Sequence, residues 1–290
     1  MLKKGYTMMH EHVTIDLSGV KGDTDCRLDC KEETICEFKK LYDFGVRNIV
    51  DVTNAGMGQN VSYVEEVAKQ TGINIIHSTG YYKEPFLPEH VYSQTVDELG
   101  KGMTREIVNG FAGMHTKANM IGEMGTSKGE MTATERKVLD AGILAHKQTG
   151  KPIYTHTTLG TYAKEQVAYF LNHDVNLKKV VIGHIDLSGD LDYIRSVLDM
   201  GVYVGFDTIG KNNYFPDTKR IEFLIKLEEE GLIDQVVLSM DITRKSQFAY
   251  KGGLGYTYLF TEFLPELRRA GMKESSIEQM LSINPQNIFA

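Results

Sequence analysis

The chain has 290 residues, enough for two average domains or for one large α/β barrel. Its 41% hydrophobic and 24% charged residues are ordinary for a soluble globular protein, and its net charge of −7 disfavours a general nucleic-acid or anionic-membrane surface. No apolar run approaches the roughly 20 residues of a membrane helix, and the N-terminal MLKKGYTMMHEH lacks the apolar core of a signal peptide. We therefore expect a cytoplasmic protein without nucleic-acid or membrane partners.

Short apolar runs alternate with longer amphipathic runs along the whole chain. The predicted strands are Tyr6 to His12, Val46 to Val52, Ile73 to Ser78, Asn119 to Met124, Pro152 to His156, Val180 to His184, Val202 to Phe206 and Gln235 to Asp241. Several are apolar throughout, which is typical of parallel strands that are covered on both faces. The predicted helices are Lys31 to Phe44, Val61 to Thr71, Thr132 to Thr149, Tyr162 to His173, Leu191 to Met200, Lys219 to Glu230, Tyr256 to Ala270 and Lys273 to Ile283, with one broken helix or two from Glu89 to Gly113.

Glycines follow five of these helices directly before a new strand, the usual place of a helix C-cap in an αβ connection: Gly45, Gly72, Gly150, Gly201 and Gly231. Eight strand-then-helix units without a Pro/Ser-rich linker predict an α/β fold, a single-domain (β/α)8 TIM barrel over residues 1–290. An open, doubly wound sheet is the alternative, because periodicity does not show whether a sheet closes.

The three cysteines, Cys26, Cys30 and Cys36, lie close together in one polar segment. An odd, small number of cysteines in a long chain argues against a disulfide framework and suits a reducing compartment. Their C-x3-C-x5-C spacing could hold zinc, but no clear fourth ligand lies beside it, so we do not expect a metal site there.

Side chains of the types that bind metals end five of the predicted strands. The active site of a barrel forms at the C-terminal ends of its strands, so these side chains are expected to converge. Imidazoles and carboxylates suit a divalent ion, most often zinc. Six ligands are too many for one tetrahedral zinc with a bound water, and they suit two ions that share a bridging carboxylate. The six are His10, His12, Glu123, His156, His184 and Asp241.

Two neighbouring polar residues are not expected to be ligands. His77 ends the third predicted strand, where a lone histidine is usually a hydrogen-bonded core or loop residue. Glu11 points away from the face shared by the two flanking histidines, so it is expected either to support the ligands from behind or to have a structural role. The HEH sequence is not a zincin motif, because Thr14 stands where that motif needs a second histidine.

The ordered ligand set and the sequence motifs around it resemble those of the phosphotriesterase family of the amidohydrolase superfamily. The closest likeness is to its phosphotriesterase homology proteins. The likeness runs from about Gly5 to the C-terminus through the motifs MHEHVTIDLSG, DVTNAGMGQN, STGYYKEPFLPEH, MIGEMGTS, THTTLGTY, VIGHIDLSGDLDYI, GFDTIGKNNYFPD, LSMDITRKS and INPQNIF.

The resemblance implies a role for each ligand. His10, His12 and Asp241 would hold the more buried zinc ion. His156 and His184 would hold the more exposed one. Glu123 would bridge the two ions together with a hydroxide, which would attack a carbonyl or phosphorus centre, and Asp241 would act as the catalytic proton acceptor.

One feature departs from the best-known members of this family, which bridge their metals with a carboxylated lysine on the fourth strand. The segment ANMIGEMG contains no lysine, and Lys117 lies too far back along the strand to reach the same ions. The resemblance therefore implies Glu123 as the better candidate for the bridging position, as in the homology-protein branch. The family name accordingly does not predict efficient phosphotriester hydrolysis.

The substrate is expected to be a small molecule, and one hypothesis gives it an anionic group. Lys211 and Arg244 follow the seventh and eighth predicted strands and would flank the outer metal, where they could anchor the phosphate of a sugar-phosphate lactone. The alternative is that both are solvated loop charges or salt-bridge partners. Tyr82, after the third strand, is expected to line the same mouth.

Three functions follow in order of preference. The first is a binuclear zinc-dependent hydrolase acting on an ester-like bond, with a lactone favoured. The second is phosphotriesterase or phosphodiesterase/deoxyribonuclease activity, against which the acidic net charge counts. The third is a non-catalytic metal-binding barrel, which would have a closed coordination shell. A homodimer is a family-level expectation.

Overall fold

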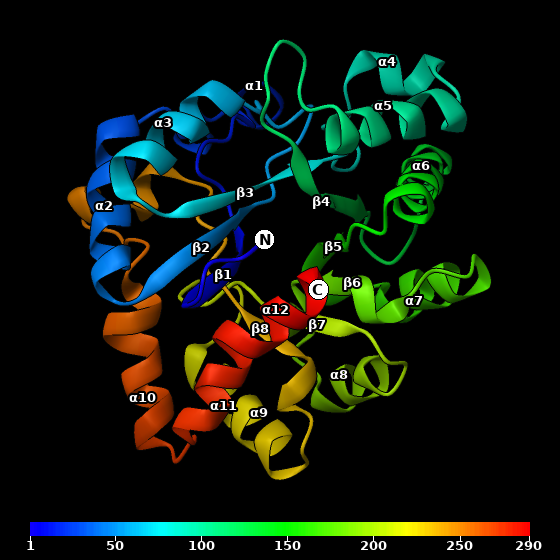
Figure 1. Ribbon diagram of the computed structural model, residues 1–290. Coiled ribbons are helices and arrows are strands. Elements are labelled where there is room, and N and C mark those ends of the chain that lie inside the picture. Colours follow the sequence, from blue (N-terminus) through cyan, green and yellow to red (C-terminus); the bar gives the residue numbers. More distant parts are fainter.

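Eight parallel strands form one sheet in the order β1 to β8, with helices around it (Figure 1). The computed structural model describes residues 1–290. The strands are Tyr6–Glu11 (β1), Val46–Asp51 (β2), Asn74–Thr79 (β3), Ala118–Thr126 (β4), Ile153–Thr157 (β5), Val180–Gly183 (β6), Tyr203–Phe206 (β7) and Val236–Leu238 (β8). The predicted (β/α)8 barrel is confirmed, and each observed strand overlaps its predicted range.

The ends of the sheet meet where β8 leads into the loop beside β1. The backbone N–H of Asp241 donates a hydrogen bond to the carbonyl of His10, with an N···O distance of 3.3 Å. The Glu11 carboxylate accepts hydrogen bonds from the backbone N–H groups of Met240 (2.7 Å) and Ile242 (3.2 Å). The open doubly wound sheet is therefore excluded, and Glu11 has a structural role, one of the two expected of it.

The helices lie outside the barrel, and most of them connect consecutive strands. They are Ser18–Lys21 (α1), Lys31–Asp43 (α2), Val61–Thr71 (α3), Glu89–Ser93 (α4), Val96–Val108 (α5), Ala133–Thr149 (α6), Ala163–Asn172 (α7), Leu191–Leu198 (α8), Asp217–Glu229 (α9), Leu264–Arg269 (α10), Glu274–Glu278 (α11) and Asn284–Phe289 (α12). The segment predicted as one broken helix or two is divided into α4 and α5, because a new N-cap stands at Thr95, whose side chain and Glu98 form a capping box. All five predicted C-cap glycines have positive φ.

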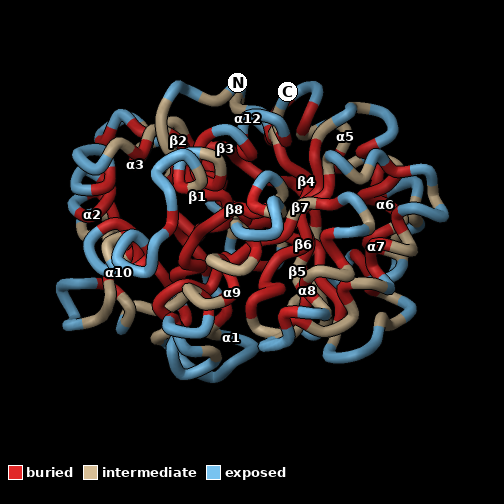
Figure 2. The backbone as a smooth tube through the Cα atoms, turned by 90° about the horizontal axis from the view of Figure 1, so that it is seen from below, coloured by how far each residue is buried: buried red, intermediate tan, exposed pale blue.

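The core has two parts, and buried backbone fills the centre of the molecule while exposed backbone lies at the periphery (Figure 2). The larger cluster lies between the strands and the helices. The smaller cluster takes side chains from seven of the strands and the segment after β2, and fills the barrel interior: Met9, Val50, Val52, Ile76, Met120, Tyr154, Val181 and Val237, with Ile288 of α12. Because Ile288 belongs to this cluster, α12 packs against one end of the barrel, near the N-terminus (Figure 1). The opposite, C-terminal ends of the strands carry the polar side chains described below.

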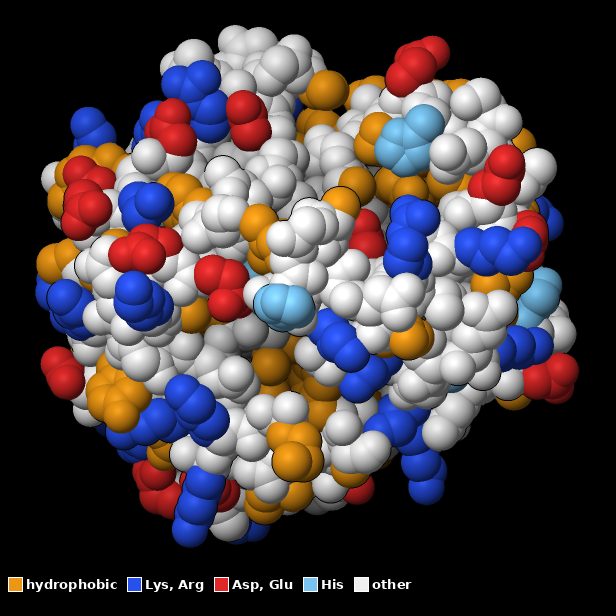
Figure 3. Space-filling view, turned by 45° about the horizontal axis from the view of Figure 1, so that its top comes forward, with side chains coloured by type: hydrophobic (Ala, Val, Ile, Leu, Met, Phe, Trp, Pro, Cys, Tyr) orange, Lys and Arg blue, Asp and Glu red, His pale blue; other side chains and the backbone are white.

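Acidic and basic side chains are interspersed over the face seen in Figure 3. None of the helices combines the length and the apolar composition that crossing a lipid bilayer requires.

Candidate metal centre

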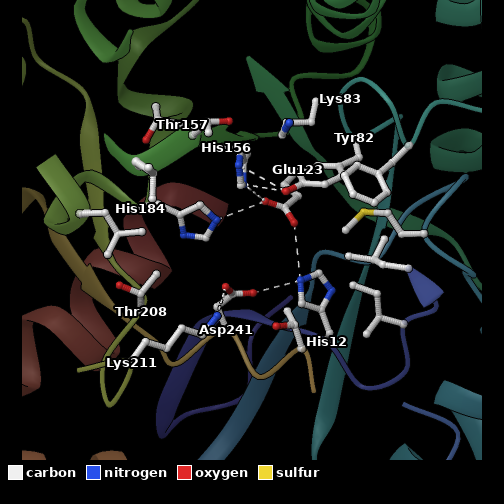
Figure 4. Close-up of a pocket in the computed structure, with 18 of the residues that line it drawn as sticks. His12, Tyr82, Lys83, Glu123, His156, Thr157, His184, Thr208, Lys211 and Asp241 are labelled. Atoms are coloured by element: carbon white, nitrogen blue, oxygen red, sulfur yellow. Dashed lines mark hydrogen bonds and ion pairs between the residues drawn. The ribbon is translucent and has the colours of Figure 1, made fainter. Parts of the chain in front are cut away.

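The structure brings the six predicted ligands together at the C-terminal ends of the strands. Figure 4 shows the five that line the cavity, which are all of them except His10. Glu123 lies at the centre of the group. Its Oε2 is 3.1 Å from Nδ1 of His156 and 3.6 Å from Nε2 of His184. The remaining distances connect the first-strand histidines to the two carboxylates: His10 Nε2 to Glu123 Oε2 3.6 Å, His12 Nε2 to Glu123 Oε1 3.5 Å, His10 Nε2 to Asp241 Oδ1 3.6 Å and His12 Nε2 to Asp241 Oδ1 3.2 Å.

Local irregularities of the backbone accompany these ligands. The pairing of β1 with β2 shifts register between Met8 and Glu11, around His10, and the pairing of β4 with β5 shifts between Ile121 and Met124, around Glu123. Such shifts re-aim side chains at the rim of a barrel. His184 (φ 58°) and Asp241 (φ 52°) adopt the left-handed conformation that non-glycine residues seldom use. Backbone strain of this kind is typical of functional sites.

The donor set fits divalent metal ions. His10 is completely buried, yet neither of its ring nitrogens has a hydrogen-bond partner, and leaving such atoms unpaired in the interior is costly. Two groups of ligand atoms within 4.8 Å of one another share Glu123: one with His10 and His12, the other with His156 and His184. Imidazole nitrogens and carboxylate oxygens in two overlapping groups are the ligands expected for a pair of ions.

The two carboxylates are ionised despite their burial. Burial alone would raise the pKa of Glu123, but the surrounding histidines hold this pKa well below its ordinary value. The pKa of Asp241 is also well below its ordinary value, because Lys211 and the histidines outweigh burial. Burial lowers the pKa of His12, yet the same two carboxylates raise it to about 9. Metal binding at His12 would therefore release a proton.

Asp207, directly after β7, is a further residue of this site that the sequence did not predict. Its Oδ1 accepts hydrogen bonds from the backbone N–H of His184 (2.9 Å) and from Nδ1 of the same residue (2.7 Å). Its Oδ2 accepts one from the hydroxyl of Tyr154 (2.7 Å). Asp207 thus holds the imidazole so that Nε2 faces Glu123, the usual task of a carboxylate behind a metal-bound histidine. Its position at a strand end was a signal available in the sequence.

The other histidines have ordinary partners outside this centre. His77 is hydrogen-bonded to Glu65 (2.8 Å), as a non-ligand would be. His146 and His173 pair with the backbone carbonyls of Lys151 and Tyr169, and His90 is hydrogen-bonded to the hydroxyl of Tyr81.

The three residues predicted to bind substrate occupy different surroundings. Lys211 is buried and forms an ion pair with Asp241. Tyr82 is buried with its hydroxyl 3.3 Å from the ring nitrogens of His156. Arg244 does not line the cavity over the centre. Its guanidinium lies 2.8 Å from a carboxylate oxygen of Asp23 and 3.6 Å from one of Asp25, which matches the salt-bridge alternative for this residue.

A cavity of about 290 Å³ opens over the ligands. Its polar wall includes His12, Glu123, His156, His184 and Asp241. Apolar side chains complete the wall: Ile15, Leu17, Met57, Phe86, Leu159 and Leu187. Concave sites with an apolar wall and a few convergent polar groups are typical of small-molecule sites.

A (β/α)8 barrel with histidines and acidic side chains at the C-terminal ends of its strands is the architecture of metal-dependent hydrolases. The chain belongs to the phosphotriesterase family, whose model matches residues 2–289. Enzymes of this family are hydrolases that use divalent metal ions, and the protein is a hydrolase of this family.

Relatives resemble the chain over nearly its whole length. It is 48% identical to a phosphotriesterase homology protein from Escherichia coli, over 98% of each chain. The crystal structure of the E. coli phosphotriesterase homology protein, complexed with phosphate in its active site, superimposes with a TM-score of 0.97 over 99% of each chain. A phospho-furanose lactonase from Mycoplasmopsis synoviae is 30% identical, over 99% of this chain and 88% of its own. The structure of a lactonase from Listeria monocytogenes has a TM-score of 0.93 at 29% identity, over 99% of this chain and 94% of its own.

Proposed function

We propose that the protein binds two zinc ions and hydrolyses an ester-like bond in a small molecule, with a lactone as the preferred substrate class. The observation that carries this proposal is the position of Glu123. A single buried carboxylate lies within reach of two pairs of histidines, His10 with His12 and His156 with His184, which suits two ions with a shared bridging ligand.

Each of the six residues would have a defined role at the two ions. His10, His12 and Asp241 would hold one ion, His156 and His184 the other, and Glu123 both. Bound ions of this kind activate water and polarise the acyl oxygen of an ester. Asp241 faces the cavity and would accept a proton at its carboxylate, because its oxygens are within reach of both the ligand cluster and Lys211.

A lactone is favoured over a phosphotriester for two reasons. Glu123 stands where the best-known phosphotriesterases carry a carboxylated lysine, and relatives over nearly the whole chain include lactonases.

The buried hydroxyl of Tyr82 lies beside His156 at the wall of the cavity. Burial raises the pKa of this phenol well above its ordinary value, so it stays protonated and can donate a hydrogen bond to a substrate oxygen.

The test is to measure the metal content of the purified protein and then its turnover of plain lactones, phosphorylated lactones, aryl phosphotriesters and DNA. We expect about two ions per chain and lactone turnover. His12→Ala should lose metal together with activity, whereas the matched control His90→Ala, at an exposed histidine bound to Tyr81, should keep both. A metal-free protein, or a fully metallated one that hydrolyses only phosphotriesters or DNA, would contradict the proposal.

A further inference from the structure

Three lysines line the cavity, and they differ in their partners. Lys211 forms an ion pair with Asp241. Lys21 and Lys83 form no ion pair with any carboxylate of the chain. The cavity therefore holds one cation that is already neutralised and two that are not. Lys21 is the last residue of α1, which follows β1, and Lys83 lies in the loop after β3.

Lys83 is held in place beside the metal ligands. The backbone N–H of Gly125 donates a hydrogen bond to the carbonyl of Tyr82 (2.9 Å), which anchors the loop after β3 to the end of β4. A Cβ atom at Gly125 would lie 3.1 Å from both Cβ and Cδ of Lys83 and 3.2 Å from Cβ of His156. The lysine stem thus lies in the space that the glycine leaves free, next to a predicted metal ligand (Figure 4).

The two unpaired ammonium groups approach the same aromatic ring. Nζ of Lys21 and Nζ of Lys83 each lie 5.9 Å from the ring centroid of Phe86. Lys83 also donates a hydrogen bond to the carbonyl of Glu84 (2.9 Å), which leaves further N–H donors of its ammonium group free. Burial lowers the pKa of Lys83, and the charge of Lys21 adds to this effect against the opposing influence of Glu135 and Glu123. An anion beside the two ammonium groups would offset their mutual repulsion and would pair with the partly buried charge of Lys83.

We propose that Lys83 and Lys21 form a binding subsite for an oxyanion group of the substrate, a phosphate or a carboxylate. This subsite lies at the end of α1 and the loop after β3, and is separate from the ion pair of Lys211 with Asp241. The inference rests on the proposed function, since the group would be held beside the centre where the ester reacts. It replaces Arg244 as the expected anchor, because the guanidinium of Arg244 is already paired with Asp23 and Asp25.

Equilibrium binding to the metal-loaded protein tests this subsite without any turnover. Isothermal titration calorimetry would compare ribose 5-phosphate with ribose for the phosphate source, and glucuronate with glucose for the carboxylate source. The variants are Lys83→Met, Lys21→Met and the double variant. Lys83→Arg should retain affinity, because it keeps the charge, and Lys178→Met removes an exposed lysine that lies outside this cavity and precedes β6.

We expect one of the anionic probes to bind more tightly than its neutral partner. Lys83→Met should remove about tenfold of that preference, since a hydrogen bond to a charged group has this order of effect, and the double variant more. Lys178→Met should change nothing. The arm that responds identifies the group as phosphate or carboxylate. Equal binding of charged and neutral probes, or an unchanged preference in the double variant, would overturn the subsite.

The outcome of this binding experiment does not depend on whether the protein hydrolyses lactones. If no lactone is hydrolysed but the charge preference depends on Lys83 and Lys21, the proposed function fails and the subsite stands. If lactones are hydrolysed and the charge preference is absent or insensitive to both variants, the subsite fails alone.

Discussion

The role of Asp207 behind His184 can be tested by the substitution Asp207→Asn. This change keeps the size of the side chain but removes its charge. It also replaces one of the two acceptor oxygens with an NH2 donor. Asp207 is completely buried. It accepts hydrogen bonds from the backbone N–H of His184, from the ring Nδ1 of His184 and from the hydroxyl of Tyr154. At least one of these partners must then lose its acceptor.

The magnitude follows from these contacts. A hydrogen bond to a charged group contributes about 1.5–3 kcal/mol, so the metal-free variant should lose roughly 2–3 kcal/mol of unfolding free energy. The carboxylate also sets which nitrogen of His184 carries the proton, leaving Nε2 to face Glu123 at 3.6 Å. Losing such a partner typically lowers metal affinity about 10- to 100-fold.

The assay is a competition with a chromophoric chelator, which measures metal affinity per chain, together with urea unfolding of the metal-free protein. The matched control is Asp192→Asn, an exposed aspartate that pairs with Arg195 at the surface and should leave both quantities unchanged. An Asp207→Asn protein that binds metal as tightly as the wild type would refute the positioning role, even if it were less stable.

Three further outcomes are expected. Arg220→Met should cost about 3–5 kcal/mol of stability in thermal or urea unfolding, because it leaves the buried carboxylate of Asp186, 2.6 Å from Arg220 Nε, without its charged partner. Glu65→Gln should remove a stability term of below about 1 kcal/mol. The hydrogen bond from His77 lowers the pKa of Glu65 from 4.5, so this term is present above pH 4.5 and is lost as the pH falls through the folded-state pKa. Removing metal with a chelator should lower Tm, and zinc at 100 times its Kd should restore about 2.7 kcal/mol.

Each of these has its own control. Arg195→Met removes a surface ion pair with Glu230 and should lower the free energy of unfolding much less than Arg220→Met does. Equal decreases would show that the buried pair stabilises the fold no more than the surface pair. For Glu65, the difference in stability from the wild type should be smaller at pH 3 than at pH 7, and a constant difference would contradict the pKa argument. A Tm that is insensitive to chelator would argue against a metal bound at the strand ends.

Local patterns in the sequence were sufficient to predict the eight strands and most of the helices, but not the short helices α1 and α12. They also placed the six candidate ligands at strand ends. Hydrophobic periodicity and C-cap glycines located all eight strands, because both signals depend only on neighbouring residues. The convergence of His12, Glu123 and Asp241 followed from the rule that parallel strands of a barrel present their C-terminal ends at one face. Asp207, directly after the seventh strand, obeys the same rule.

The tertiary structure alone decided the partners of the charged side chains. Arg244 and Asp23 are 221 residues apart in the chain, and nothing local indicates that they pair. Likewise, only the folded barrel shows that Lys211 is neutralised by Asp241. The same is true of Lys21 at the end of α1 and Lys83 in the loop after β3, which approach one aromatic ring. The physical reason is that secondary structure follows from the local chain, whereas which charges meet depends on how distant loops pack around the mouth of the barrel.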